Sequence, residues 1–228
     1  MDILSSTGAP LEQVSIDEAY LDLTALCPAA DADTALRQAI FIAQGLKDRI
    51  RSEQQLTCTL GIATNKLLSK LASDLKKPDG LTVITEAEKI SLLRPMPVRK
   101  LYGVGEVTEQ ILHRAGLRTI GDLQDYPGDL THLVGSFSGQ LKQYAFGIDD
   151  RPLELHWEQK SISAEETFLE DTSEQPVIFE ALWQQAGEIE AELREVRKDA
   201  LCVSVKVRYS NFTTLTRQTT LQDPASLY

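Results

Sequence analysis

The eight residues 15–22, with the sequence SIDEAYLD, constrain the fold of this chain more than any other stretch. Asp17 and Glu18 lie between two short runs, 13–16 and 19–21, whose β-branched and aromatic residues favour strands. The pattern therefore predicts a hairpin with two carboxylates at its turn. Adjacent carboxylates repel each other unless a cation neutralises them, and Mg²⁺ is a hard cation that takes such oxygen ligands. For this pair alone, an ordinary acidic turn remains the alternative.

A second informative run follows at residues 57–84. Residues 57–63 are typical of a buried strand, and residues 65–75 repeat apolar positions at helical spacing. Residues 76–80 end that helix with turn chemistry, and residues 81–84 predict a further strand. Lys66 and Lys70 are interpreted as the solvated face of the helix, with phosphate contact as the less favoured alternative. A long helix over about 34–51 connects the hairpin to the first of these strands.

Short helices are predicted between residues 98 and 148, namely 106–115, 119–125, 129–134 and 138–146. The stretch LYGVGEVT at residues 101–108 resembles a helix-hairpin-helix motif. Gly103 and Gly105 are expected to let backbone N–H groups at a helix start approach a phosphate closely. Residues 134–139 fit either a degenerate second copy or a packing turn.

The last part of the chain predicts a helix over 178–196 followed by two antiparallel strands, 201–209 and 212–221. Trp183 falls on the apolar stripe of the helix and is interpreted as a core residue rather than a base-stacking platform. Residues 202–222 carry Lys206, Arg208 and Arg217 and no acidic residue. These three cations are candidates for contact with nucleic acid.

The net charge of −11 argues against a nucleic-acid partner when the chain is taken as a whole. The charge is unevenly divided, however, because residues 66–118 hold ten Lys and Arg against six Asp and Glu. This partition favours an oriented nucleic-acid-binding face. With 42% hydrophobic and 25% charged residues, the composition favours neither a disordered chain nor a membrane protein.

Three ordered blocks of this sequence resemble the Y-family DNA polymerases of the DNA polymerase IV type. They are SIDEAYLD at residues 15–22, GIATNKLLSKLASD at 61–74 and KKPDGLTVI at 76–84. The resemblance continues to the end of the chain, where residues 160–168 look like the first strand of the little-finger domain. It implies templated nucleotidyl transfer of the translesion type, from a deoxynucleoside triphosphate to a primer 3′-hydroxyl, with two Mg²⁺ ions in the complete site.

The resemblance also assigns roles to individual residues. Asp17 would be a metal ligand, Glu18 the adjacent catalytic and metal-binding carboxylate, and Lys77 a contact to the triphosphate. Gly103, Gly105, Lys206, Arg208 and Arg217 would contact DNA. Primer-template DNA and deoxynucleoside triphosphates are the implied partners, with the sliding clamp as a further candidate. A monomeric, cytoplasmic protein without membrane attachment is expected.

The chain departs from the family pattern before the hairpin, where only residues 1–12 are present. A first carboxylate-bearing strand, an aromatic gate and a fingers domain are therefore expected to be missing, and the end of the little finger as well. The expected fold class is α/β (α+β) and multidomain. It comprises a partial palm at 1–94, an all-helical thumb at 95–148, a linker at 149–159 and a partial α+β little finger at 160–228.

The first interpretation is an impaired or inactive polymerase fragment, and two alternatives to it stay open. One is a non-catalytic DNA-binding module derived from such a polymerase, which the missing first strand favours. The other is a palm-type nucleotide cyclase, which also places carboxylates on a hairpin, and which the helix-hairpin-helix and little-finger segments disfavour.

Overall fold

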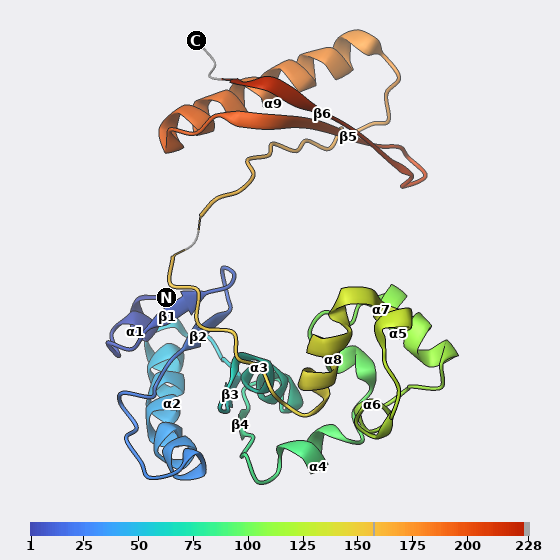
Figure 1. The fold of residues 1–228 in the computed structure, drawn as a ribbon. Helices are drawn as coiled ribbons and strands as arrows, with labels where there is room; N and C mark the ends of the chain where they lie inside the picture. The colour runs from blue at the N-terminus through green and yellow to red at the C-terminus, as the bar shows by residue number, and fades with distance from the viewer. Residues whose placement is uncertain (157, 226–228) are drawn as a thin grey trace. The chain divides into compact units, whose positions relative to one another are not determined.

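The computed structural model describes residues 1–156 and 158–225 of the 228-residue chain. The chain divides into two compact units, the first formed by residues 1–156 and the second following it. Each unit contains both helices and strands, which confirms the mixed α+β class (Figure 1). None of the described helices combines the length and the apolar character of a membrane span.

The first unit contains two separate two-stranded sheets. After a short helix α1 (Asp2–Ser5), β1 (Leu11–Gln13) pairs with β2 (Ala19–Leu21) in an antiparallel hairpin. The second sheet pairs β3 (Leu60–Ile62) in parallel with β4 (Leu81–Val83). A parallel pair needs a crossover connection, and α3 (Lys66–Leu75) provides it.

Two capped helices hold the second sheet in place. Helix α2 (Ala32–Gln54) begins where the side chain of Asp31 accepts a hydrogen bond from the Thr34 amide, and it buries Leu36, Ala39, Ala43 and Leu46 on one face. Helix α3 packs closely on β3. A Cβ atom at Gly61 would lie 2.0 Å from the carbonyl oxygen of Ser69, so this approach requires glycine.

Short helices make up the rest of the first unit. They are α4 (Lys89–Leu93), η1 (Val98–Lys100), α5 (Glu106–Arg114), α6 (Ile120–Asp125), α7 (Thr131–Val134), η2 (Gly135–Phe137) and α8 (Ser138–Ala145). Leu68 of α3, Leu112 of α5 and Leu141 of α8 are fully buried in one shared cluster. The hydrophobic core therefore joins the β3–α3–β4 layer to the helices that follow it.

The second unit consists of α9 (Gln175–Val196) and an antiparallel pair, β5 (Ala200–Arg208) with β6 (Thr214–Ala225).

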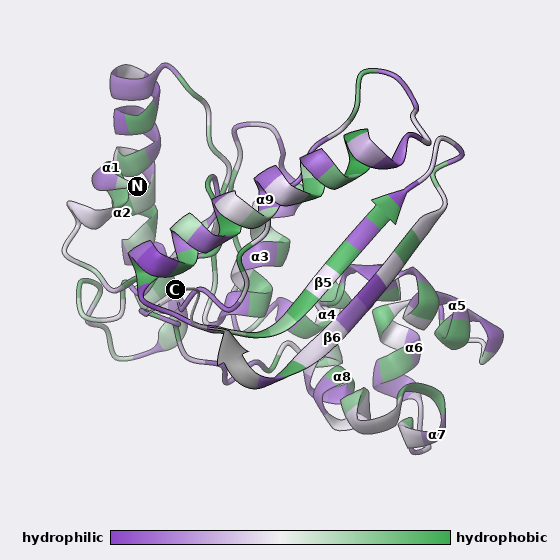
Figure 2. Ribbon diagram, turned by 90° about the horizontal axis from the view of Figure 1, so that it is seen from above, coloured by the Kyte–Doolittle hydropathy of each residue, from purple (hydrophilic) through white to green (hydrophobic). Residues whose placement is uncertain are grey.

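Two predictions from the sequence are wrong for this unit. Residues 160–168 form no strand, and Trp183 is 79% exposed instead of buried. The exposure of Trp183 follows from a thin core, because Ala181 is the one buried residue of α9 and Val203 of β5 is 47% exposed. Figure 2 shows polar and apolar residues alternating along β5.

Candidate functional site

Asp17 lies exposed and Glu18 half-buried in the turn between β1 and β2, as the hairpin pattern predicts. The hydroxyl of Ser15 donates a hydrogen bond of 2.6 Å to Oδ1 of Asp17 and accepts one of 3.0 Å from the Glu18 amide. The amide of Val14 closes the turn by donating to the Glu18 carbonyl oxygen at 2.9 Å. The serine therefore fixes the turn that carries both carboxylates.

Basic side chains from α3 and the turn after it lie near these carboxylates. Lys70 forms an ion pair with Glu18. Lys77 pairs with Asp74 at 2.6 Å, and this partner raises the pKa of Lys77, with smaller contributions from the negative charges of Glu18 and Asp17. The structure thus brings Asp17, Glu18 and Lys77 within electrostatic reach of one another.

The interpretation of Lys66 as a solvated residue is wrong. Its ammonium group lies 2.6 Å from Oε2 of Glu12, and the two side chains are only 10% and 11% exposed. Glu12 also accepts a hydrogen bond of 2.9 Å from the Glu154 amide. Lys66 and Lys70 both connect α3 to the hairpin, through partners that lie 54 and 52 positions away in the chain.

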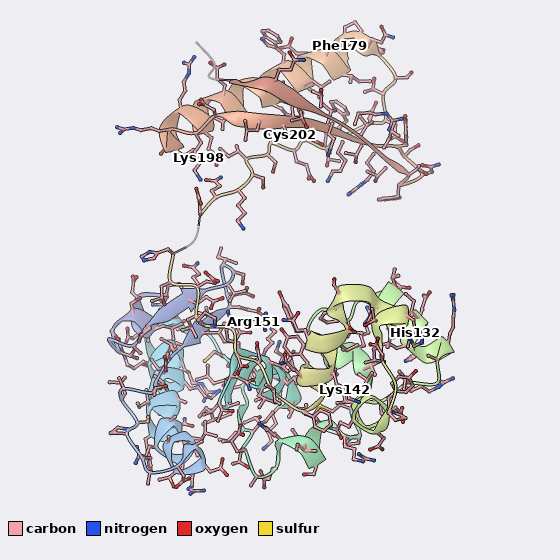
Figure 3. All side chains as sticks on the ribbon, in the orientation of Figure 1. His132, Lys142, Arg151, Phe179, Lys198 and Cys202 are labelled. Atoms are coloured by element: carbon pink, nitrogen blue, oxygen red, sulfur yellow. The ribbon has the colours of Figure 1, made fainter. Side chains whose placement is uncertain are left out.

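A second buried ion pair lies in the connection that leaves α8, where Figure 3 labels Arg151. The Asp149 side chain is 1% exposed and accepts hydrogen bonds from Nε of Arg151 at 2.8 Å and from the Leu67 amide at 3.0 Å. Burial alone would raise the pKa of Asp149, but the hydrogen bonds from Arg151 and Leu67 outweigh it and hold this pKa below its ordinary value. The guanidinium of Arg151 also stacks 4.4 Å from the Tyr102 ring centroid. The sequence alone predicts only a linker at residues 149–159.

The two glycines of the helix-hairpin-helix motif have different roles. Gly103 has φ of +83°, and a Cβ atom there would lie 2.8 Å from the ring of Phe137. Gly105 is the N-cap residue of α5 with φ of −83°, and nothing lies within 4 Å of its Cβ position. Gly103 therefore shapes the turn, whereas Gly105 leaves open space in front of the first amides of α5.

The three cations of the second unit do not share one face of its sheet. Lys206 lies opposite Thr216 and Arg208 opposite Thr214, while Arg217 lies opposite Val205. Because opposite residues of a ladder share a face and successive residues alternate, Lys206 and Arg208 are on the polar face with the threonines. Arg217 is on the other face, among the valines.

The donor set of the hairpin fits a hard divalent cation. Within residues 1–156 and 158–225, no group of three or more His, Cys, Asp and Glu side chains is placed to hold a metal ion. Mg²⁺ is usually bound by one or two carboxylates, with water and substrate phosphates completing its shell. Asp17 and Glu18 offer those two carboxylates at an exposed turn beside basic side chains.

Comparison with known proteins finds one family along most of the chain. Residues 1–74 match the impB/mucB/samB family, residues 86–117 match the IMS family HHH motif, and residues 159–227 match the impB/mucB/samB family C-terminal domain. DNA polymerase IV of Halorhodospira halophila (strain DSM 244 / SL1) is 36% identical over 225 residues, which are 98% of this chain and 62% of the relative. DNA polymerase IV of Methanoculleus marisnigri (strain ATCC 35101 / DSM 1498 / JR1) is 39% identical over 97% of this chain and 60% of the relative.

A solved structure, the Y-family DNA polymerase chimera Dbh-Dpo4(243-245)-Dbh, shares the fold with a TM-score of 0.83 at 24% sequence identity. The match covers 99% of this chain and 64% of the chimera. The chain thus spans about three fifths of the length of the curated relatives it matches. A Y-family relationship implies dependence on a divalent metal ion in general. From three family matches in chain order and a shared fold, we conclude that the chain belongs to the impB/mucB/samB family, in the DNA polymerase IV group of the Y-family polymerases.

Proposed function

We propose that this chain serves templated nucleotidyl transfer of the translesion type, with Asp17 and Glu18 as its metal-binding and catalytic carboxylates. The observation that carries the proposal is the serine-fixed turn, which presents both carboxylates next to Lys70, the ion-pair partner of Glu18. The same motif stands in the region that matches the impB/mucB/samB family. Its DNA polymerase IV relatives are 36% and 39% identical over nearly the whole chain.

Each residue of the turn has a defined task in this proposal. Asp17 and Glu18 would hold Mg²⁺, which when bound neutralises phosphate charge and polarises the reacting phosphoryl oxygen. Ser15 keeps the Asp17 carboxylate oriented through its hydrogen bond. Lys70 balances the charge of Glu18, and Lys77 offers a compact, strongly hydrated cation to a triphosphate.

Primer-template DNA would be held largely through its backbone. The first amides of α5 point into the open space at Gly105, where a phosphate can approach them and the positive end of the helix dipole. Lys206 and Arg208 add charge on the polar face of β5 and β6. Such contacts do not read base sequence. Contact with a sliding clamp, a monomeric state and a cytoplasmic location remain predictions.

Binding of a nucleotide opposite a template base tests this function without requiring turnover. The chain is mixed with a primer-template whose 3′ end is blocked, and binding of the matched and of mismatched deoxynucleoside triphosphates is measured with and without Mg²⁺. We expect Mg²⁺-dependent preference for the matched nucleotide. Glu18→Gln should weaken this binding about tenfold or more, whereas Glu53→Gln, at an exposed glutamate paired with Arg49, should not. Equal binding of all nucleotides would refute the proposal.

A non-catalytic DNA-binding module is the second candidate function. It is supported by the helix start at Gly105 and by the polar face with Lys206 and Arg208, which can contact DNA without any role for the carboxylates. This candidate predicts DNA binding without any Mg²⁺-dependent nucleotide preference, so the same titration separates the two functions.

The differing roles of the glycines lead to a paired prediction. Gly105→Ala should leave the melting temperature nearly unchanged, because its φ of −83° and its open surroundings accept a methyl group. It should lower the affinity for duplex DNA several-fold by obstructing the phosphate. Gly103→Ala should instead destabilise the protein by about 1–3 kcal/mol through its positive φ. Thermal melting and a DNA titration on the same samples check both, and an unchanged affinity for Gly105→Ala would rule out the backbone contact.

A further inference from the structure

The turn at residues 76–80, between α3 and β4, has a conformation that the backbone does not favour by itself. Asp79 has φ of +63°, in the left-handed region that is uncommon for residues other than glycine. Gly80 follows, where a Cβ atom would lie 2.2 Å from the carbonyl oxygen of Lys76. The turn is therefore tight, and Lys77 lies within it, two residues before Asp79.

The ammonium group of Lys47, on α2, clamps this turn to the second sheet. It donates hydrogen bonds to the carbonyl oxygen of Asp79 at 2.9 Å and to Oδ1 of the same residue at 2.6 Å. It also donates to the carbonyl oxygen of Cys58 and lies 3.3 Å from that of Gly80. Four oxygen atoms, from the turn and from the segment that leads into β3, thus surround one cation.

The clamp is largely withdrawn from solvent. The Lys47 side chain is 9% exposed and the Asp79 side chain 30%. A charge so far removed from water needs an opposite charge and hydrogen bonds, which the Asp79 carboxylate and the carbonyl oxygens provide. Arg51, one turn further along α2, pairs with the second carboxylate oxygen of Asp79. The hydrogen bond from Lys47 is the main reason why the pKa of Asp79 lies below its ordinary value.

The side chain of Lys77 extends from this fixed backbone. It is 55% exposed, and its ion-pair partner Asp74 lies on the last turn of α3. A long lysine side chain loses conformational freedom when it binds a ligand. A backbone that is already fixed lowers the total cost of placing the charge of Lys77.

We propose that Lys47 and Asp79 are positioning residues for nucleotide binding, which fix the turn that carries Lys77 so that its charge is placed for contact with a triphosphate. The inference rests on the proposed function, in which Lys77 makes that contact. Neither Lys47 nor Asp79 touches the triphosphate, and both act through the turn. The carboxylate of Asp79 is needed as an anchor, because glycine would adopt the same φ more easily.

Two substitutions at Asp79 separate anchoring from backbone conformation. Asp79→Gly accepts the left-handed φ but removes the carboxylate that Lys47 and Arg51 hold. Asp79→Asn tolerates the same φ and keeps a side-chain oxygen as an acceptor. With the full chain on a blocked primer-template, Asp79→Gly should weaken Mg²⁺-dependent binding of the matched deoxynucleoside triphosphate about fivefold, and Asp79→Asn should restore most of it. Wild-type affinity in Asp79→Gly would overturn the proposal.

Coupling to Lys77 gives a readout that a general loss of stability would not change. Lys77→Met should weaken nucleotide binding about tenfold. In that background Asp79→Gly should have no further effect, because the turn then carries no charge to place. Arg49→Met is the control, since Arg49 lies two residues along α2 from Lys47 in an exposed pair with Glu53, and it should leave binding unchanged. Additive losses in the double variant would overturn the proposal.

Hydrogen exchange of the Leu60 amide tests the clamp without a nucleotide. This amide donates to the Gly80 carbonyl oxygen at 3.0 Å, the same oxygen that lies near Lys47. Lys47→Met and Asp79→Gly should each speed its exchange about tenfold, whereas the Ile84 amide, at the other end of the β3–β4 pair, should exchange as in the wild type. Unchanged exchange at Leu60 in both variants would overturn the clamp. Failure of the proposed function looks different, because the wild-type chain would then bind no nucleotide, and the inference would fall with it.

Discussion

Raising the salt concentration from about 50 to about 200 mM should lower the affinity of this chain for duplex DNA about 100-fold, which corresponds to about four phosphate contacts. The whole chain carries a charge of −11, so binding depends on local basic surface. In the second unit this is the polar face that carries Lys206 and Arg208, and in the first unit the backbone amides at the start of α5 are a separate candidate contact. Fluorescence anisotropy with a labelled duplex over a series of salt concentrations measures the slope of log affinity against log salt concentration.

The register of β5 and β6 supplies a matched control for this measurement. Replacing Lys206 and Arg208 together by glutamine should reduce the salt slope by about two contacts. Arg217→Gln removes the same kind of charge from the opposite face and should change the slope little. Affinity that is insensitive to salt, or an equal effect of Arg217→Gln, would contradict the assignment of the polar face.

Arg151→Ala should destabilise the first unit by about 3 kcal/mol. The substitution leaves the Asp149 carboxylate buried, with its side chain 1% exposed and its strongest partner gone, and such loss of one partner of a buried pair costs about 3–5 kcal/mol. Because the Leu67 amide still donates a hydrogen bond to Asp149, we expect a loss of stability at the lower end of this range. Urea unfolding, monitored by hydrogen exchange of amides in the first unit, measures this change in the free energy of unfolding. Arg49→Ala, which breaks an exposed pair with Glu53, should cost less than about 1 kcal/mol.

The pH dependence of this pair has a defined sign. The folded-state pKa of Asp149 is lowered, so the ionised carboxylate stabilises the folded protein. This stabilisation is complete above the unfolded-state pKa of about 3.9, and it is lost as the pH falls through the folded-state pKa. The difference between wild type and Arg151→Ala should therefore shrink as the pH is lowered below about 4. A difference that stays constant from neutral to acidic pH would show that the charge of Asp149 is not the cause.

Local signals in the sequence predict much of the architecture. The turn at Asp17 and Glu18, the helix after Asn65 and the glycine-rich start of α5 all follow from capping, periodicity and turn chemistry within a few residues. Helix α2 begins at Ala32 rather than near residue 34 because Asp31 caps it. These features depend on neighbours in sequence, which is why pattern reasoning finds them.

The missed features depend on contacts between distant residues. The burial of Lys66 needs Glu12 from the hairpin, and the burial of Asp149 needs the start of α3. The face on which Arg217 lies is set by strand register, and a shift of one residue would reverse it. Trp183 has the spacing of a core residue, but helical spacing shows only which face is apolar and not whether another element covers it.

Extension of an unblocked primer by one matched nucleotide in Mg²⁺ tests the central claim most directly. The account predicts slow, template-directed addition by this chain, no addition by Asp17→Asn or Glu18→Gln, and unchanged addition by Glu53→Gln. Addition that survives both carboxylate substitutions would contradict the assigned site. Duplex binding without any addition or Mg²⁺-dependent nucleotide preference in the wild-type chain would instead favour the DNA-binding module.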